Sequence, residues 1–284
     1  MARTAVVDNV LEFDYDKIKA REAEVARETD ADIIARLRER FDILTEMTKA
    51  VKTGDVRAMI VSGPPGVGKS FGVEEVLGKD DLFDKLGERK PRYEIVKGAM
   101  SSIGLYAKLY EFSGEKNVVV FDDCDSILLD DLSLNILKGA LDSSARRFIS
   151  WNTDSRLLRS EGIPDRFEFK GAAIFITNIK FEHVRSKKLK DHLAALESRC
   201  HYIDLQMDTN REKLLRIRQI VGDGMLDRYE FVQGVQEEIV QFIDANQDRL
   251  RELSLRMVLK VADLRKSFPN SWQSMARTTC MKRT

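Results

Sequence analysis

Short apolar runs alternate with longer amphipathic stretches along the chain, and this rhythm predicts its elements. Runs of strand length are Ala58–Val61, Tyr93–Val96, Val118–Phe121, Ala173–Ile176 and Tyr202–Leu205. Apolar residues at helical spacing fill the intervals over Ser70–Leu77, Ser101–Phe112, Leu132–Leu141 and Leu189–Leu196. Repeated strand–helix units of this length predict an α/β fold, with a parallel sheet sandwiched by helices.

The regions on either side of these units carry no strand signal. Residues 15–52 read as one long helix, because apolar residues such as Ile33 and Leu37 recur at helical spacing. After Met207 we expect helices near 210–220, 228–245 and 253–266. The predicted organisation is an N-terminal helical extension over 1–52, an α/β domain over 53–207, a small all-helical lid domain over 208–266 and a C-terminal tail over 267–284.

A glycine-rich segment lies between the first predicted strand and the following helix. It reads Gly63, Pro64, Pro65, Gly66, Val67, Gly68, Lys69, Ser70 and fits the pattern G-x-x-x-x-G-K-[ST] at every fixed position. Glycines let a backbone wrap closely around phosphate, and the positive end of the next helix adds to the attraction. We therefore predict an ATP site in which Lys69 reaches the β- and γ-phosphates and the Ser70 hydroxyl ligates Mg²⁺.

Two aspartates follow the third predicted strand. A phosphate loop needs a carboxylate at the end of a nearby strand to orient the metal ion. Asp122 is the candidate for that role, directly or through water, and Asp123 is the candidate for orienting or deprotonating the attacking water. Read alone, an Asp–Asp pair after a strand is a polar turn, and the phosphate loop is what favours the catalytic interpretation.

With these motifs in place, the chain resembles the AAA+ ATPases over roughly residues 51–265. Asp122 and Asp123 resemble the Walker B box, in which a glutamate usually stands where this chain has Asp123. Asn178, at the end of the fourth predicted strand, resembles sensor 1, which hydrogen-bonds the γ-phosphate and the attacking water. The alternative for Asn178 is a side chain that caps a turn.

Two arginines complete the resemblance. Ser198, Arg199 and Cys200 resemble the Ser-Arg-Cys box of clamp-loader subunits, so the resemblance makes Arg199 an arginine finger donated to a neighbouring subunit. Arg256 resembles sensor 2, through which the helical lid detects the γ-phosphate. The alternatives are a cation that closes a helix C-terminus for Arg199 and a solvated helix residue for Arg256. The resemblance implies a homo-oligomeric ring or arc, with six subunits as the family habit.

Composition narrows the classes of protein further. The 47 basic residues equal the 47 acidic ones, which argues against uniform nucleic-acid binding and leaves room for a local basic patch. Three cysteines, far apart and without CxxC spacing, argue against a disulfide scaffold or a zinc site. No apolar run is long enough for a membrane span and no signal peptide is evident, so we expect a cytoplasmic protein without a membrane partner.

Three segments are candidates for contacting a client polymer. The resemblance places a central loop over 97–104, where Met100 and Ile103 could grip polypeptide. Residues 142–170 mix arginines with Phe148 and Trp151, which suits stacking on single-stranded nucleic acid, with a solvated surface hairpin as the alternative. The third is the basic run 185–190, a candidate phosphate contact, for which the alternative is a plain solvated loop or a subunit contact.

Three functional hypotheses remain open on the sequence. The first is a DNA-directed ATPase, a loader or remodeller in replication that acts on single-stranded or duplex DNA. The second is a motor that remodels a protein client. The third is a nucleotide-gated interaction module with little turnover, suggested by the aspartate at position 123.

Overall fold

The computed structural model describes residues 23–78 and 91–283, which form two compact units. Within the described residues, the first unit takes 40–63 and 69–205. The second takes 23–39, the loop residues 64–68 and the chain from Gln206 onwards. Residues 1–22, the first part of the expected N-terminal extension, lie outside the described residues.

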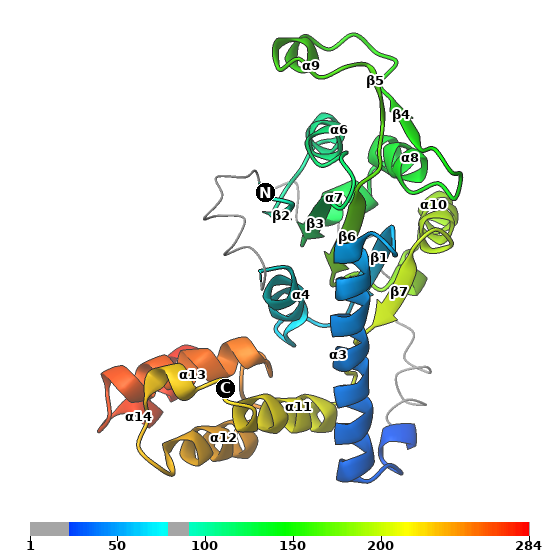
Figure 1. Cartoon of the computed structure of the whole chain (residues 1–284). Coiled ribbons are helices and arrows are strands. Elements are labelled where there is room, and N and C mark those ends of the chain that lie inside the picture. Colours follow the sequence, from blue (N-terminus) through cyan, green and yellow to red (C-terminus); the bar gives the residue numbers. More distant parts are fainter. Residues whose placement is uncertain (1–22, 79–90, 284) are drawn as a thin grey trace. The chain divides into compact units, whose positions relative to one another are not determined.

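A five-stranded parallel sheet forms the centre of the first unit (Figure 1). Its strands are β1 (Ala58–Ser62), β2 (Tyr93–Lys97), β3 (Val118–Asp122), β6 (Ala172–Thr177) and β7 (His201–Asp204). They lie in the order β2-β3-β6-β1-β7, and every neighbouring pair is parallel. The predicted α/β fold and all five predicted strands are therefore confirmed, to within a residue or two at their ends.

Helices cover both faces of this sheet, because alternate residues of each strand point to opposite sides. Ile60, Phe121 and Phe175 pack on one side with apolar residues of α6 (Ser102–Glu111), α8 (Asp131–Ala140) and α10 (Lys187–Glu197). On the other side, residues such as Met59 and Ile174 pack with α4 (Lys69–Gly78) and the C-terminal half of α3 (Asp30–Thr53). The central strands β1, β3 and β6 are buried along their whole length, which fixes the ends of these strands, where the candidate site residues lie.

A small hairpin lies in the connection between α8 and β6. Strands β4 (Phe148–Ser150) and β5 (Arg166–Glu168) pair antiparallel around the short helix α9 (Arg156–Ser160), and the hairpin projects beyond the sheet in Figure 1. This agrees with the surface hairpin considered for residues 142–170. Two further short helices, α7 (Asp125–Leu128) and η1 (Phe181–His183), follow β3 and β6.

The second unit is built mainly of helices around its own apolar core. They are α11 (Asn210–Gly222), η2 (Asp227–Tyr229), α12 (Val235–Ala245), α13 (Leu255–Ser267) and α14 (Trp272–Cys280). A capping box at Thr209 starts α11, in which Glu212 accepts hydrogen bonds from the Thr209 backbone and hydroxyl groups. Arg36 of α3 also donates to the fully buried Glu212, so the N-terminal half of α3 is tied to α11 within this unit.

Three expectations about helices differ from the structure. The single helix expected over 15–52 is broken at residues 26–29, because the Thr29 hydroxyl and the Asp32 carboxylate cap a new helix reciprocally. The helix expected over 228–245 begins only at Val235, after Gly234 in a left-handed conformation with φ 89°. The stretch expected as a C-terminal tail contains α14, whose Trp272 and Cys280 are buried in the helical core.

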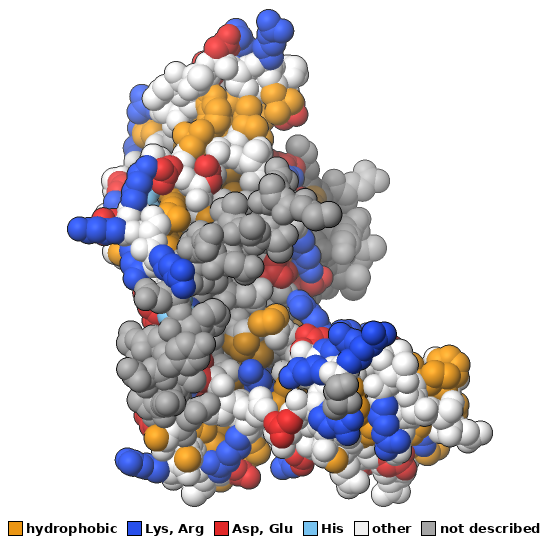
Figure 2. All heavy atoms as spheres, turned by 180° about the vertical axis from the view of Figure 1, so that it is seen from behind, with side chains coloured by type: hydrophobic (Ala, Val, Ile, Leu, Met, Phe, Trp, Pro, Cys, Tyr) orange, Lys and Arg blue, Asp and Glu red, His pale blue; other side chains and the backbone are white. Residues whose placement is uncertain are grey.

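Acidic and basic side chains both occur across the face of the molecule seen in Figure 2, as expected from their equal numbers. Within the described residues, every helix is too short or too polar to cross a bilayer.

Candidate nucleotide-binding site

The phosphate loop leaves β1 and runs directly into α4. Gly68, a fixed glycine of the motif, and Gly66, at one of its variable positions, have φ values of 102° and 72°, a region that side-chain-bearing residues rarely adopt, so the backbone path favours glycine at both positions. Helix α4 begins at Lys69, which places the positive end of a ten-residue helix at the loop. The loop thus has the backbone form that a phosphate cradle needs.

Lys69 is buried, and its ammonium group is held at the centre of the site. Nζ donates to the Gly63 carbonyl at 2.6 Å and to Oδ1 of Asn178 at 2.8 Å. Asn178 follows β6 and is exposed, so the two candidate residues meet from different elements of the unit. Together they present a cation and an amide side by side, a pair suited to phosphate oxygens.

Ser70 and Asp122 meet in the same way. The Ser70 hydroxyl donates to Oδ1 of Asp122 at 2.9 Å, and Asp122 is 4% exposed. The ammonium of Lys97, at the end of β2, lies 3.6 Å from Oδ2 of Asp122. A hydroxyl and a carboxylate oxygen in contact are hard ligands of the kind that Mg²⁺ takes in addition to phosphate and water.

Asp123 differs from its neighbour in exposure and in backbone conformation. It is exposed, and its φ of 54° places it in the left-handed region. Its N–H donates to the Ile176 carbonyl at 3.0 Å, and its Oδ1 accepts from Nδ2 of Asn178 at 2.7 Å. Among residues with a Cβ, aspartate and asparagine tolerate this conformation best. The backbone therefore gives a physical reason for aspartate where the AAA+ pattern has glutamate.

The strand order explains why these side chains converge. β6 lies between β1 and β3, with Thr177 beside Ser62 and Ile176 beside Asp122. Asn178 therefore emerges between the phosphate loop and the aspartate pair, and it contacts Lys69 on one side and Asp123 on the other.

A second group of residues supports the aspartates, and sequence reasoning did not single it out. The Thr177 hydroxyl donates to Oδ1 of Asp125 at 2.6 Å. Burial raises the pKa of Asp125 although this hydrogen bond opposes the rise. Burial likewise raises the pKa of the Cys124 thiol to about 11, so this cysteine is a protonated core residue at neutral pH. The string Asp122-Asp123-Cys124-Asp125 could have revealed Asp125, but its partner Thr177 is distant in sequence.

Arg199 lies at the end of α10 and is half-buried. Its Nη1 donates to the Ala195 carbonyl in the last turn of that helix, at 2.5 Å, which is the helix-closing contact considered as the alternative to an arginine finger. Its Nε is buried and has no hydrogen-bond partner among the described residues. A finger role would require the guanidinium to turn toward a neighbouring subunit.

Arg256 begins α13 beside a residue of the phosphate loop. The Leu255 N–H donates to the Gly66 carbonyl at 2.8 Å. A Cβ built on Gly66 would lie 3.6 Å from Cγ of Arg256 and only 2.7 Å from Cβ of Ser254, so this loop residue is in close contact with the start of the helix. Arg256 is exposed, and none of the described residues pairs with its guanidinium.

The residues present fit Mg-ATP. Ser70 and Asp122 would hold the metal ion, and Lys69 and the loop backbone would hold the phosphates. Bound Mg²⁺ supplies charge neutralisation for phosphoryl transfer. Within residues 23–78 and 91–283 there is no cluster of three or more His, Cys, Asp or Glu side chains that could form a separate metal site.

The segments considered for contacting a client polymer contain both buried and exposed residues. Met100 and Ile103 are half-buried against the apolar core below α6, so the expectation that they are exposed for gripping polypeptide is wrong. In the hairpin, Arg147 is buried and Trp151 is half-buried against Tyr106, so the expected surface position is wrong for Arg147 and only partly met by Trp151. Arg147 is anchored by the carbonyls of Ala140 and Gly171, and Trp151 is anchored by its packing against Tyr106.

The other cations of these segments lie on the surface. Arg146 pairs with Glu168, Arg159 pairs with Asp154 and Lys188 pairs with Asp131. The basic run over residues 185–190 starts α10, where the Ser186 hydroxyl accepts from the Leu189 N–H. Its Arg and Lys side chains are exposed, which leaves the phosphate-contact interpretation of this run open as a proposal.

Comparison with known proteins shows sequence similarity to a phage protein. No family model matches the chain. An uncharacterized 36.7 kDa protein from the nrdC–mobD intergenic region of Enterobacteria phage T4 is 32% identical over 268 residues, which cover 93% of this chain and 80% of the phage protein. The chain belongs to the family of this phage T4 protein. The relationship to the phage T4 protein spans both units, so the two proteins share an evolutionary origin along most of their length.

A structural similarity to C. elegans PCH-2 is much weaker. It has a TM-score of 0.32 and 13% sequence identity, and it covers 98% of this chain and 70% of PCH-2. The assignment of an α/β fold with a phosphate loop therefore rests on the sheet, its strand order and the loop residues.

Proposed function

We propose that this relative of the phage T4 protein is an AAA+ ATPase that binds Mg-ATP, hydrolyses it to ADP and phosphate, and acts as a homo-oligomeric ring or arc. The observation that carries the proposal is the convergence of Lys69, Ser70, Asp122, Asp123 and Asn178 through direct side-chain hydrogen bonds. A phosphate cradle, a metal-binding carboxylate and a second carboxylate beside an amide are the parts that phosphoryl transfer requires.

The oligomeric part of the proposal rests on Arg199. The transferred phosphoryl group needs cations near its oxygens, and an arginine supplied by a neighbour is worth about 10³–10⁵ in rate. We assign Arg256, which is exposed beside Gly66, as sensor 2. Arg199 closes its own helix in the structure, and we assign it as the finger that acts on the next subunit. Hydrolysis would then take place at the interface between copies.

The client that we propose is DNA, as for a loader or remodeller. The hairpin carries exposed Arg146, Phe148 and Arg166 side chains, a combination that suits nucleic-acid stacking and phosphate contact. The protein-client hypothesis has less support, because Met100 and Ile103 are half-buried.

The decisive experiment is the steady-state rate of phosphate release from ATP, measured with and without single-stranded DNA and with Lys69→Ala as the control. We expect turnover that Lys69→Ala abolishes and DNA increases several-fold. A rate that Lys69→Ala leaves unchanged would overturn the ATPase proposal. Turnover that is indifferent to DNA would overturn only the DNA-directed part.

One observation favours a second candidate, a nucleotide-gated module with little turnover. Asp123 is a methylene shorter than glutamate, and its Oδ1 is already engaged by Asn178. If Asp123 cannot reach a water molecule, nucleotide would bind and remain intact. Tight ATP binding that depends on Lys69, without measurable phosphate release from the assembled protein, would support this candidate.

A further inference from the structure

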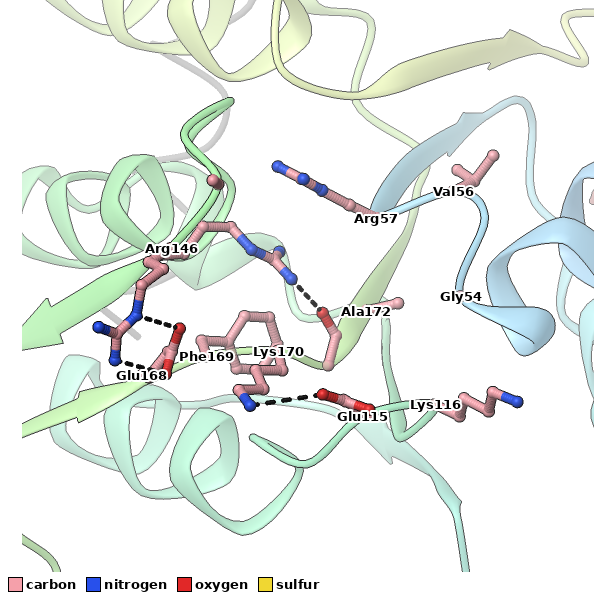
Figure 3. Close-up of a pocket in the computed structure, with 13 residues that line it drawn as sticks. Gly54, Val56, Arg57, Glu115, Lys116, Arg146, Glu168, Phe169, Lys170 and Ala172 are labelled. Atoms are coloured by element: carbon pink, nitrogen blue, oxygen red, sulfur yellow. Dashed lines mark hydrogen bonds and ion pairs between the residues drawn. The ribbon is translucent and has the colours of Figure 1, made fainter.

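A cavity of about 560 Å³ opens at the edge of the sheet opposite the phosphate loop. Its walls come from the segments that lead into β1, β3 and β6, that is, from the amino ends of parallel strands whose carboxyl ends carry Lys69, Asp122 and Asn178. Figure 3 shows side chains from these segments and from the hairpin around one space. None of them belongs to the candidate nucleotide site.

The charged side chains of this pocket are unbalanced. Five lining residues are cationic and two are acidic. Glu168 pairs with Arg146 at 3.0 Å and Glu115 with Lys170 at 3.4 Å, which uses both carboxylates. The three remaining cations are Arg57, Lys116 and Arg147. The pocket wall therefore carries a net positive charge that its own carboxylates do not neutralise.

Two of these three arginine and lysine side chains are held in place by carbonyl groups. The buried guanidinium of Arg147 donates to the carbonyls of Ala140 at 3.0 Å and Gly171 at 2.9 Å. Nη1 of Arg57 faces the carbonyls of residues 142–144, the nearest of them Ser144 at 3.0 Å. Carbonyl groups position a guanidinium without cancelling its charge.

The position of Arg57 is what suggests an anionic ligand. No described residue accepts a hydrogen bond from its Nε or Nη2, so part of its planar fork is available, and Figure 3 shows the side chain extending over the pocket. Burial, together with repulsion from Arg57, lowers the pKa of Arg147 to about 10. An anion between the two guanidinium groups would relieve that repulsion. Lys116 extends away from the other cations in Figure 3 and marks the rim.

Two arginines and an aromatic ring extend from the pocket onto the hairpin. Arg146 lines the pocket, and its guanidinium carbon lies 4.9 Å from the ring centroid of Phe148. The guanidinium carbon of Arg166 lies 4.5 Å from the same centroid, and Phe148 is 38% exposed. Guanidinium planes and aromatic rings are the surfaces on which unpaired bases stack.

We propose that this pocket binds a backbone phosphate of single-stranded nucleic acid, with Arg57 as its main ligand and an adjacent base resting on the Arg146–Phe148–Arg166 stack. A forked, uncompensated cation such as Arg57 suits a phosphate, and a stacking surface next to it, as on the hairpin, suits a strand. The inference deepens the DNA-directed part of the proposed function by naming where the strand lies. It does not depend on hydrolysis.

The test is equilibrium binding of a dye-labelled oligothymidylate of about 16 nucleotides, followed by fluorescence anisotropy across a range of salt concentrations. We expect Arg57→Gln to weaken binding about 3- to 10-fold and to lower the slope of log K against log[salt] by about 0.7, the value for one phosphate contact on a single strand. Arg57→Lys should keep the slope, because it keeps the charge. Phe148→Ala should weaken binding while leaving the slope unchanged.

Two matched variants separate this pocket from other cations. Arg251→Gln removes the same charge from an exposed arginine of the helical unit and should leave binding as it is. Lys190→Gln tests the basic run at the start of α10. An equal loss in Arg57→Gln and Arg251→Gln, or a loss in Lys190→Gln alone, would overturn the proposal. Thermal unfolding of each variant identifies any that fails to fold, and if Arg57→Gln does so, Phe148→Ala decides: binding as tight as that of the wild type would overturn the proposal.

Two further measurements identify the source of the phosphate and separate a failure of this inference from a failure of the proposed function. If inorganic tripolyphosphate competes as well as the oligonucleotide at equal phosphate concentration, the ligand is a small phosphate and the nucleic-acid assignment is wrong. ATP turnover is measured on the same Arg57→Gln protein without DNA and should match the wild type. Lost DNA binding with intact turnover supports the pocket. Failed turnover with Arg57-dependent DNA binding overturns the ATPase proposal alone.

Discussion

Asp123 offers the sharpest test of hydrolysis, because one substitution can change its chemistry while leaving its geometry in place. Asp123→Asn replaces a carboxylate oxygen by an amide oxygen that can still accept the hydrogen bond from Asn178 Nδ2, now 2.7 Å long. Asparagine also tolerates the left-handed backbone with φ 54°. We therefore expect the free energy of unfolding to change by less than about 0.5 kcal/mol, as at ordinary surface positions.

The loss of the carboxylate should appear in the rate instead. A positioned general base contributes about 10²–10⁴ in rate. That factor corresponds to about 2.7–5.4 kcal/mol of activation free energy. Phosphate release should fall by this factor in Asp123→Asn, whereas the affinity for a fluorescent ATP analogue stays within about twofold. Equal rates for Asp123→Asn and the wild type would refute the assignment of Asp123 as the base.

Asp123→Glu is the informative companion substitution. Glutamate restores the residue that the AAA+ pattern has, but its longer side chain lacks the local hydrogen bonding that lets aspartate occupy the left-handed region. We expect the free energy of unfolding to fall by about 1 kcal/mol. If stability does not fall, the backbone is not the reason for aspartate at this position.

Three further outcomes follow from features described above. Asp125→Asn should flatten the dependence of stability on pH: burial raises the pKa of Asp125 in the folded state, so its contribution is fully present below the ordinary carboxyl pKa and declines as pH rises through the folded pKa, which urea titrations at several pH values would detect. Trp272→Ala should lower the free energy of unfolding by about 3–5 kcal/mol, measured by urea denaturation, whereas a loss below about 1 kcal/mol would mean that α14 is dispensable. Mixing Lys69→Ala with Arg199→Ala protein should restore some ATP turnover if Arg199 acts on a neighbouring subunit, and no recovery with intact assembly would contradict that geometry.

Much of the sheet could be predicted because its signals are local. Buried parallel strands are apolar on both faces, so runs such as Val118–Phe121 are recognisable without knowledge of their partners. The phosphate loop is equally local, since its glycines and Lys69 are adjacent in sequence. The direct contacts of Lys69 with Asn178 and of Ser70 with Asp122 follow once the strands are placed in one sheet.

The remaining features depend on contacts between distant segments. In the sequence, Arg147 is one of several cations in the hairpin segment and nothing sets it apart. It is buried only because the carbonyls of Ala140 and Gly171 accept hydrogen bonds from its guanidinium. Helix α14 did carry a signal, since Trp272, Ala276 and Cys280 recur every four residues, but a repeat of only three positions in so polar a stretch is a weak pattern. The left-handed backbone of Asp123 is compatible with aspartate but cannot be inferred from that residue type alone.

The order of strands also has a consequence for how the protein is made. β1 pairs with β6 and β7 and with no strand nearer in sequence, and Ala58 meets Ala173, 115 positions further along the chain, from 58 to 173. At about 5–20 residues per second, a ribosome needs about 6–23 s to synthesise that interval. Throughout this time the partner strands of the apolar segment Met59-Ile60-Val61 have not yet been synthesised, and the phosphate loop that follows this segment has no sheet to hold it. The nascent chain can therefore assemble its candidate nucleotide site only after most of the α/β unit has left the ribosome.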